Sequence, residues 1–312
     1  MAEIELKSIN DAVRHSALAL IADSESNYMK SISGVADHLE SSGAKIILLA
    51  GPSSSGKTTT ANILKDHLAE RGHETVVISM DNFYREMSDP AYPRDELGEL
   101  DYEAVGALDT DKIHDCISAL LTGQDVRIPR YVFGTGESLK EAIEISFPPG
   151  GFVIIEGIHA LNPIITSGLD GSAIIKIFIS VSTNICEDGN RILSGRKIRF
   201  IRRMTRDSLY RGTDAASTLA RWSSVLAGED KYLYPFKATA DISIDTFHKY
   251  ELGVMKPFAM RAIEASGAAI GGEFIDIIKN AISRFDEIDI EEVPVTSLIR
   301  EFVPGGKYES LY

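Results

Sequence analysis

The chain has 312 residues, of which 44% are hydrophobic and 25% charged, a composition typical of one large globular domain or two small ones. Its net charge of −14 argues against a general nucleic-acid or membrane-surface binder. No apolar run is long enough to span a bilayer, and the N-terminus lacks the apolar core of a signal peptide. Cys116 and Cys186 lie far apart, without the spacing of a metal site. We therefore expect a cytoplasmic protein with reduced cysteines and no nucleic-acid or membrane partner.

Residues 10–40 carry apolar side chains at helical spacing, and Ser41-Ser42-Gly43 ends that pattern. The spacing predicts a helical N-terminal extension over residues 1–44. Its role would be packing against the core or against a second copy of the chain, which would make the protein a homo-oligomer.

A strand, a glycine-rich turn and a helix start follow one another in residues 45–60, KIILLAGPSSSGKTTT. The turn matches G-x-x-x-x-G-K-[ST], whose curled backbone and helix N-terminus bind phosphate groups. Lys57 would reach the β- and γ-phosphates, and Thr58 would hold Mg²⁺. An ordinary glycine-rich turn is the alternative, but the flanking strand and helix favour nucleotide binding. The candidate nucleotide-binding residues of the loop are Gly51, Ser53, Ser54, Ser55, Gly56, Lys57, Thr58 and Thr59.

Two further buried strands are expected at residues 74–79 and 152–156, and they lead to the acids Asp81 and Glu156. The carboxyl ends of strands in an open α/β sheet form the edge where ligands bind. Asp81 would accept a proton from a hydroxyl group, and Glu156 would hold a metal ion or its waters. For either acid alone, a surface carboxylate or a helix cap is an equal alternative, but their shared position favours a site.

Strand and helix patterns alternate along the rest of the core. Residues 85–108 are polar and contain two prolines, which predicts a loop, and the next helix would be capped by Thr110 and end at Gly123. The alternation predicts an α/β P-loop NTPase fold, a mainly parallel sheet with helices on both faces. Strands are also expected at residues 126–128, 142–147, 173–180 and 241–245.

The segment from 184 to 230 is rich in arginine in an otherwise acidic chain. A solvated helix face with salt bridges, a nucleic-acid patch and a lid that clamps phosphates are the three interpretations. The phosphate loop upstream favours an arginine-rich lid over about residues 190–230. The basic residues are Arg191, Arg196, Lys197, Arg199, Arg202, Arg203, Arg206 and Arg211.

Residues 251–266 and 272–285 have the pattern of two helices, and residues 294–312 form a tail with two apolar pairs. We expect this C-terminal helical extension, residues 251–312, to pack against the core and to carry no chemistry by itself.

Seven segments share a recognisable order and spacing: GPSSSGKTT at 51–59, SMDNFY at 79–84, LDYEAVGALD at 100–109, IPRY at 128–131, IIEGIHAL at 154–161, RRMTRDSLYRG at 202–212 and YPFKATADISI at 234–244. Together they resemble the uridine kinase and phosphoribulokinase family of P-loop kinases. They cover roughly residues 45–250, which would form the kinase domain. The remainder is similar to the extension of the longer bacterial uridine kinase-like members.

The resemblance implies roles for residues on the phosphate side. Asp81 is similar to the family's catalytic base, with Lys57 and Arg206 acting beside it. Thr58 and Glu156, together with Asp81, would form the Mg²⁺ environment.

The resemblance also implies roles on the acceptor side. Asp81 would face the acceptor, Asp101 would hold ribose hydroxyls, and Tyr131 would lie beside the base. Arg203, Arg206 and Arg211 would bind the nucleotide phosphates, and Arg203 would contact the substrate as well.

Three positions depart from the family pattern. Uridine–cytidine kinases usually carry a histidine shortly after the tyrosine that matches Tyr131, where this chain has Gly136. The lid motif usually ends Arg-Gly-Arg, but here it ends in Thr213, and Arg221 stands at a substrate position where a glutamine is expected. The residues expected to take part in phosphoryl transfer therefore match the family pattern, while those expected to recognise the acceptor differ from it.

The sequence predicts a kinase that uses ATP or GTP with Mg²⁺ to phosphorylate a hydroxyl of a small molecule, with the 5′-hydroxyl of uridine or cytidine as the best guess. A same-fold kinase for a sugar, polyol or small hydroxy acid is the first alternative, and Arg221 favours it because an extra arginine suits an anionic acceptor. The second alternative is a nucleotide- or RNA-binding module without turnover, against which the intact Asp81 and Glu156 argue.

Overall fold

The computed structural model of the chain describes residues 2–95, 98–132 and 135–311. Its centre is a sheet of β2 (Ile46–Ala50), β3 (Thr75–Ser79), β6 (Phe152–Glu156), β7 (Ile174–Ser180) and β10 (Ile242–Asp245). The strand order is β10-β7-β2-β6-β3, and every neighbouring pair is parallel. The predicted parallel sheet is confirmed, and the strand that leads into the phosphate loop lies in its middle.

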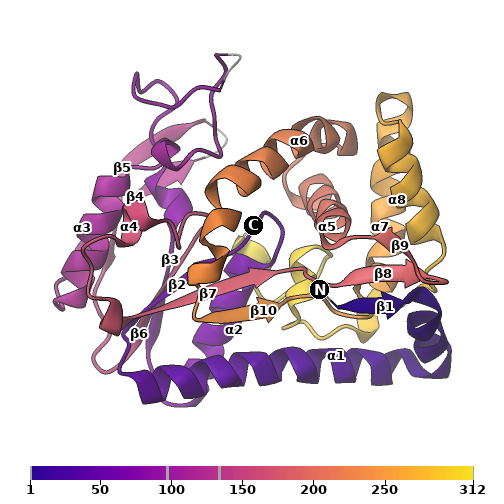
Figure 1. The fold of residues 1–312 in the computed structure, drawn as a ribbon, viewed down its shortest axis with the longest axis horizontal. Coiled ribbons are helices and arrows are strands. Elements are labelled where there is room, and N and C mark those ends of the chain that lie inside the picture. The colour runs from indigo at the N-terminus through magenta and orange to yellow at the C-terminus, as the bar shows by residue number, and fades with distance from the viewer. Residues whose placement is uncertain (1, 96–97, 133–134, 312) are drawn as a thin grey trace.

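Helices cover both faces of this sheet (Figure 1). The long N-terminal helix α1 (Leu6–Ser42) runs along the molecule, leaves helical geometry at Ser16 and ends at Gly43, whose φ is +72°. The predicted N-terminal helix is therefore present. The other helices are α2 (Lys57–Glu70), α3 (Thr110–Leu121), α4 (Pro163–Thr166), α5 (Gly195–Tyr210), α6 (Ala215–Tyr232), α7 (Glu251–Ser266) and α8 (Glu273–Ser283).

Strand β2 is buried on both faces because its alternate side chains enter two different cores. Ile47 and Leu49 belong to the larger core, which also contains side chains of α1, α2, α5, α7 and α8. Ile46 and Leu48 belong to the smaller core, to which α3 contributes. This burial on both sides explains why the strand reads as an uninterrupted apolar run.

Two short strands were expected before and after residue 135, and they form a longer antiparallel hairpin instead. β4 (Val126–Val132) pairs with β5 (Glu137–Ile145). The predicted end of the first strand before Pro129 is wrong, since the pairing continues past it through a register shift between Ile128 and Arg130. The irregularity accommodates a proline that has no N–H to give to the ladder.

A second small sheet was not predicted. β1 (Glu3–Glu5) pairs in parallel with β8 (Asn184–Glu187), which forms a hairpin with β9 (Asn190–Leu193). The hairpin turn, Asp188-Gly189, has positive φ at both residues. An Asp-Gly pair is a strong hairpin signal, so this turn was recognisable in the sequence.

The start of α3 corrects one predicted cap. Thr110 is the first helical residue, and the cap is Asp109, whose side chain accepts a hydrogen bond from the Lys112 N–H at 3.2 Å. Asp and Thr are both good caps, and the shift by one residue lies within the usual uncertainty of helix ends.

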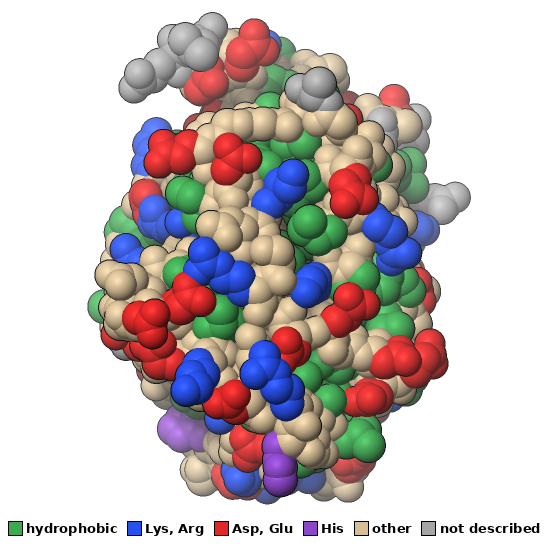
Figure 2. All heavy atoms as spheres, turned by 90° about the vertical axis from the view of Figure 1, so that its right-hand side faces the viewer, with side chains coloured by type: hydrophobic (Ala, Val, Ile, Leu, Met, Phe, Trp, Pro, Cys, Tyr) green, Lys and Arg blue, Asp and Glu red, His purple; other side chains and the backbone are tan. Residues whose placement is uncertain are grey.

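Among the helices that the structure describes, none has the length and apolar character needed to cross a bilayer. Figure 2 shows basic and acidic side chains interspersed over the described part of one face. That face therefore lacks the uniformly basic field that nucleic-acid binders present.

Candidate active site

The phosphate loop joins the end of β2 to α2 through a tight backbone curl. A Cβ built on Gly51 would lie 2.5 Å from the carbonyl oxygen of Ile179, so only glycine fits there. Gly56 has φ +89°, which glycine adopts without strain, and Ser54 also has a positive φ of 57°. The curl places the first turn of α2, with its free N–H groups, at the loop, and such a helix start attracts anions.

Polar groups of the loop fit a bound polyphosphate. The buried hydroxyl oxygens of Ser54 and Ser55 have no hydrogen-bond partner within the described residues. Buried hydroxyls are normally paired, and phosphate oxygens would supply the partners. The Lys57 ammonium donates to the carbonyl oxygen of Pro52 at 3.3 Å, so it folds back over the loop.

Asp81 and Glu156 come close together where β3 and β6 end. The Thr58 hydroxyl donates to Oε1 of Glu156 at 3.1 Å. The pKa of Glu156 is raised to about 7, chiefly by burial and then by the charge of Asp81, while Lys57 opposes the rise. Asp81 keeps exposed surface, yet desolvation by the surrounding protein raises its pKa against the attraction of Lys57. A cation bound between the two carboxylates would relieve their mutual repulsion.

The donor set of this corner suits Mg²⁺, which prefers hard oxygen ligands. Its members would be Thr58, Asp81 and Glu156. Within the described residues, no group of three His, Cys, Asp or Glu side chains is arranged to hold a metal ion. An ion here would therefore take most of its ligands from water and from phosphate oxygens, as Mg²⁺ usually does in phosphoryl transfer.

Three of the predicted lid arginines gather around one carboxylate, Asp207 of α5. Arg206 donates to Oδ1 at 3.0 Å, Arg203 pairs with Oδ2 at 3.4 Å, and Arg211 lies 3.8 Å from Oδ1. The sequence analysis did not single out Asp207, although its spacing of four residues from Arg203 and from Arg211 was a usable signal.

This arginine cluster lies next to the phosphate loop. Arg203 donates to the Ser53 hydroxyl at 2.8 Å. The charges of Arg211 and Arg206 both lower the pKa of Asp81, so they lie within electrostatic reach of it.

Two other arginines of α5 are buried beneath the phosphate loop. Arg199 pairs with Glu229 and Arg202 pairs with Glu251, each at 2.7 Å, and all four side chains are at most 1% exposed. Each arginine also donates to a backbone carbonyl of the phosphate loop, at 2.9 and 3.4 Å. Their guanidinium groups are thus engaged by the protein, and the predicted lid role stays with the other three arginines.

Four tyrosines lie together near Asp81. The rings of Tyr84 and Tyr131 are 5.4 Å apart between centroids, and those of Tyr92 and Tyr102 are 5.9 Å apart. The Tyr84 hydroxyl donates to the Tyr102 carbonyl at 3.1 Å. Burial raises the pKa of Tyr84, and the nearby charge of Asp81 raises it further. Aromatic surface beside a carboxylate suits a ligand that contains a planar ring.

Asp101 connects the loop of residues 85–108 to α6. Its Oδ1 accepts hydrogen bonds from the N–H groups of Glu103 and Ala104, both at 3.1 Å. Its Oδ2 accepts a hydrogen bond from the Tyr232 hydroxyl at 3.3 Å. Part of its hydrogen-bonding capacity therefore already serves the loop.

Glu103 is a titratable residue that the sequence analysis did not single out. Burial raises its pKa to about 7, and the charges of Arg203, Lys57 and Asp81 all act on it. Glu103 also packs against α6, since a Cβ built on Gly228 would lie 2.3 Å from the Glu103 Cβ. The sequence signal that could have singled out Glu103 was its position within the segment LDYEAVGALD.

His159, on the turn after β6, was also missed, although it lies within IIEGIHAL. The ring is 1% exposed, and burial lowers its pKa to about 4, so it is neutral at pH 7. It meets the Tyr232 ring edge-on, with centroids 6.1 Å apart. Neither ring nitrogen forms a well-aligned hydrogen bond within the described residues, although the Glu103 backbone interacts with the ring.

The structure gives a steric reason for the first departure from the family pattern. Gly136 has φ +72°, and a Cβ there would lie 2.5 Å from the Met87 sulfur. A side chain at this position would carry the strain of the positive φ and would have to displace the Met87 side chain, so glycine is the residue that fits with least strain. Residues 133–134 of the same segment lie outside the described residues.

The other two departures lie on either side of the start of α6. The Thr213 N–H donates to the Asp207 carbonyl at 3.1 Å, so this residue closes the end of α5. Arg221 is exposed on α6, next to the buried Trp222.

A phosphate loop at the centre of a parallel sheet, with two acids at neighbouring strand ends, defines the class: this is a P-loop phosphotransferase. The sequence profile of the Phosphoribulokinase / Uridine kinase family matches residues 46–252 of the 312. The chain belongs to this family, which confirms the resemblance predicted from the sequence.

Several proteins are similar to this chain. A uridine kinase of Staphylococcus aureus (strain JH9) is 30% identical over 201 residues, 64% of this chain and 86% of that protein. A structure described as a possible uridine kinase from Bacillus stearothermophilus has a TM-score of 0.47 at 18% identity, covering 70% of this chain and 98% of that one. A D-glycerate 3-kinase from Cryptococcus neoformans var. grubii has a TM-score of 0.33 at 15% identity, covering 87% of each chain.

Proposed function

We propose that the protein transfers the γ-phosphoryl group of ATP to the 5′-hydroxyl of a pyrimidine nucleoside, uridine or cytidine. The carrying observation is the position of Asp81, which lies within electrostatic reach of Lys57 and Glu156 and also of Tyr84. A carboxylate between the phosphate side and the aromatic side is where a proton acceptor for the attacking hydroxyl is needed.

The chain supplies the parts of this reaction as follows. The loop N–H groups and Lys57 bind the β- and γ-phosphates, and Arg203, Arg206 and Arg211 add positive charge around them. Asp81 takes the proton from the hydroxyl as the hydroxyl oxygen attacks the γ-phosphorus, and the bond from that phosphorus to the bridging oxygen breaks, so that ADP leaves. Thr58, Asp81 and Glu156 would hold Mg²⁺, which supplies positive charge against the phosphate oxygens.

The acceptor side favours an uncharged molecule with a planar ring. Tyr84 and Tyr131 offer aromatic surface, and Asp101 and Glu103 are hydrogen-bond acceptors for hydroxyl groups. These carboxylates, together with Asp81, would repel an anionic acceptor. The uridine kinase of Staphylococcus aureus at 30% identity supports the same assignment.

A sugar or polyol kinase is the second candidate. The observation that favours it is Gly136, which offers no side chain to contact a base and would accept one only with backbone strain and displacement of Met87. A hydroxy-acid acceptor, which Arg221 suggested in the sequence, gains little support because that arginine is exposed.

A coupled ADP-release assay tests these assignments. It would use Mg-ATP with uridine, cytidine, purine nucleosides, pentoses, polyols and glycerate, and then Mg-GTP with the best acceptor. We expect the highest kcat/KM for uridine or cytidine. A sugar or polyol as best acceptor would support the second candidate, and glycerate would contradict the charge argument. Nucleotide binding without turnover on any acceptor would favour a binding module.

A further inference from the structure

The C-terminal part of the chain folds back onto the phosphate loop. Leu298–Glu301 form a short 3₁₀ turn, and Leu298 itself is fully buried. Its side chain lies directly against the loop, since a Cβ built on Gly56 would be 2.7 Å from Leu298 Cδ1. We call residues 297–303 the C-terminal strap.

Glu301, at the end of this turn, bridges two elements of the candidate active site. Its Oε2 accepts a hydrogen bond from the Thr59 hydroxyl at 2.6 Å, and its Oε1 pairs with Arg206 at 3.4 Å. The Glu301 and Arg206 side chains are only 5% and 7% exposed. One buried carboxylate thus contacts both the first turn of α2 and an arginine of α5.

The contacts of Arg206 restrict where its guanidinium points. Nε and Nη2 donate to Asp207, and Nη1 faces Glu301. Charge-assisted contacts on different nitrogens of one planar group set its orientation as well as its position. Removing the Glu301 charge would leave Nη1 without its partner while the Asp207 contacts remain.

The strap is itself anchored on both sides of Glu301. The Ser297 hydroxyl is 2.7 Å from the Tyr250 hydroxyl and accepts a hydrogen bond from the Ile299 N–H at 3.0 Å. On the other side, the Phe302 ring packs on the Arg202 guanidinium, 4.9 Å from its centroid.

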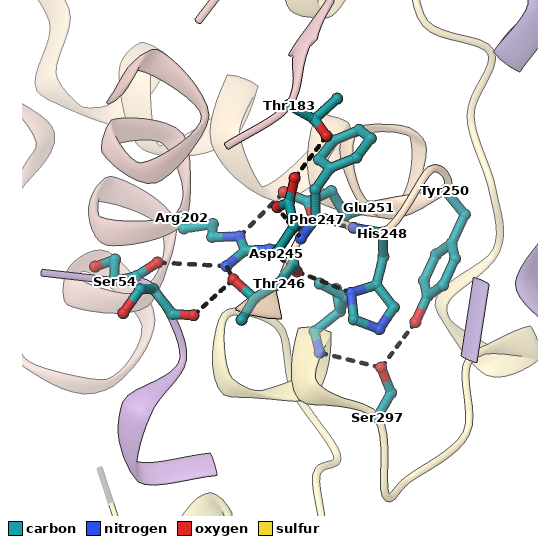
Figure 3. A network of polar contacts seen from close by, with 12 residues as sticks. Ser54, Thr183, Arg202, Asp245, Thr246, Phe247, His248, Tyr250, Glu251 and Ser297 are labelled. Carbon is teal, nitrogen blue, oxygen red and sulfur yellow. Dashed lines mark hydrogen bonds and ion pairs between the residues drawn. The ribbon is translucent and has the colours of Figure 1, made fainter. Parts of the chain in front are cut away.

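Figure 3 shows the Tyr250–Ser297 contact close to the polar contacts that Arg202 makes with Ser54 of the phosphate loop and with Glu251. Arg202 pairs with Glu251 and donates to the Ser54 carbonyl, while the Thr246 hydroxyl donates to the Ser55 carbonyl at 2.8 Å. The strap therefore packs against residues whose side chains donate hydrogen bonds to the backbone of the phosphate loop.

We propose that Glu301 is a positioning residue for phosphoryl transfer, which holds Arg206 and Thr59 in place, and that the C-terminal strap is a working part of the nucleotide site. This inference rests on the proposed function, because it takes Arg206 to act on the transferred phosphate. It assigns chemistry to a segment that the sequence analysis treated as packing only.

The first test compares Glu301→Gln with a core control, Ile282→Ala, on the acceptor that the wild type uses best. Glutamine keeps an oxygen for Thr59 but removes the charge that faces Arg206. We expect kcat to fall about tenfold to a hundredfold, the loss that misplacing a catalytic group produces, with the acceptor KM within about twofold. Ile282 is fully buried on α8, so Ile282→Ala should lower the Tm at least as much as Glu301→Gln does, while its kcat stays unchanged.

The second test asks whether Glu301 acts through Arg206. The two substitutions Glu301→Gln and Arg206→Ala would be combined, with Arg206→Lys as a replacement for the alanine variant if that variant does not fold. We expect Glu301→Gln to cause no further loss of kcat once Arg206 has been changed.

Two results would overturn the inference: a kcat loss in Glu301→Gln that merely follows its Tm, as in the core control, or losses that multiply in the double variant. Absence of turnover by the wild type on every acceptor would instead refute the proposed function, and the positioning role with it. The wild-type measurement therefore separates the two failures.

Discussion

The Thr58 hydroxyl donates to Glu156 across the gap between α2 and β6, at 3.1 Å. Asp81 lies within electrostatic reach of Glu156, and its charge, together with burial, raises the pKa of Glu156 to about 7. The two carboxyl groups and the hydroxyl therefore lie close together, and the two carboxyl groups favour keeping one proton between them. A divalent cation would take the place of that proton.

We expect Mg²⁺ affinity in the presence of ADP to rise with pH up to about 7 and then to level off. The pKa of Glu156 is raised from an ordinary 4.5 to about 7, so the folded protein holds a proton between these values that the unfolded chain has lost. This group's contribution to stability is therefore present below pH 4.5 and lost as the pH rises through 7. Because Mg²⁺ requires the carboxylate, its binding should release the proton below pH 7.

Titration calorimetry at pH 6, 7 and 8, in buffers of different ionisation enthalpy, measures both the affinity and the released proton. In the Glu156→Gln variant we expect weaker binding that keeps only the pH dependence of the terminal phosphate of ADP, whose second pKa is about 6. A wild-type affinity that changed with pH no more than that of the variant would show that Glu156 does not bind the ion.

Replacing Asp81 with Asn tests the proton acceptor. We expect kcat to fall by about 10²–10⁴, the usual contribution of a general base, while the affinity for ADP alone changes little. Exposed Asp115 of α3 offers a matched control, and Asp115→Asn should leave both quantities unchanged. Turnover retained in Asp81→Asn would exclude Asp81 as the base.

The sheet and the phosphate loop were predictable because their signals are local. The central strands β2 and β6 are short apolar runs that are buried at every position. The loop is marked by fixed spacing, and the structure shows why its glycines are required at Gly51 and Gly56.

The partners of the charged residues were not predictable, because they are distant in sequence. Glu301 contacts Thr59 across 242 positions, and Arg202 meets Glu251 across 49. Composition alone does not reveal which arginines of a basic segment face solvent and which are buried with a carboxylate. In the same way, the small β1-β8-β9 sheet joins the N-terminus to a hairpin far along the chain.

The arginines of α5 should therefore differ sharply in their effect on stability. Arg199→Met would leave Glu229 buried without its partner, which costs about 3–5 kcal/mol. Arg196→Met, on the same helix, removes a pair with Asp230 in which both side chains are substantially exposed, and should cost at most about 1 kcal/mol.

Urea unfolding of the two variants measures this difference directly. If both arginines had similar small effects, the buried pair would not be a structural support of the phosphate loop. If both substitutions caused a large loss of stability, the exposed Arg196–Asp230 pair would be part of a larger network.

The last prediction concerns the acceptor side, where we expect Glu103→Gln to raise the KM for the acceptor about fivefold to tenfold and to leave the KM for ATP within about twofold. Removing a charged hydrogen-bond acceptor from a hydroxyl group costs about 1–1.4 kcal/mol, which corresponds to this factor. With one negative charge fewer, the ratio of kcat/KM for glycerate to that for uridine should also rise. Steady-state kinetics with both acceptors measures these values.

The exposed Glu99 on the same loop is the matched control, and Glu99→Gln should change neither KM. A second variant, Gly228→Ala, acts on the same carboxylate from α6, because the added methyl group would collide with the Glu103 side chain. We expect it to raise the acceptor KM as well. If Glu103→Gln raised the KM for ATP instead, Glu103 would serve the nucleotide through its neighbours Arg203 and Lys57. The acidic character of the acceptor side would then rest on Asp81 and Asp101 alone.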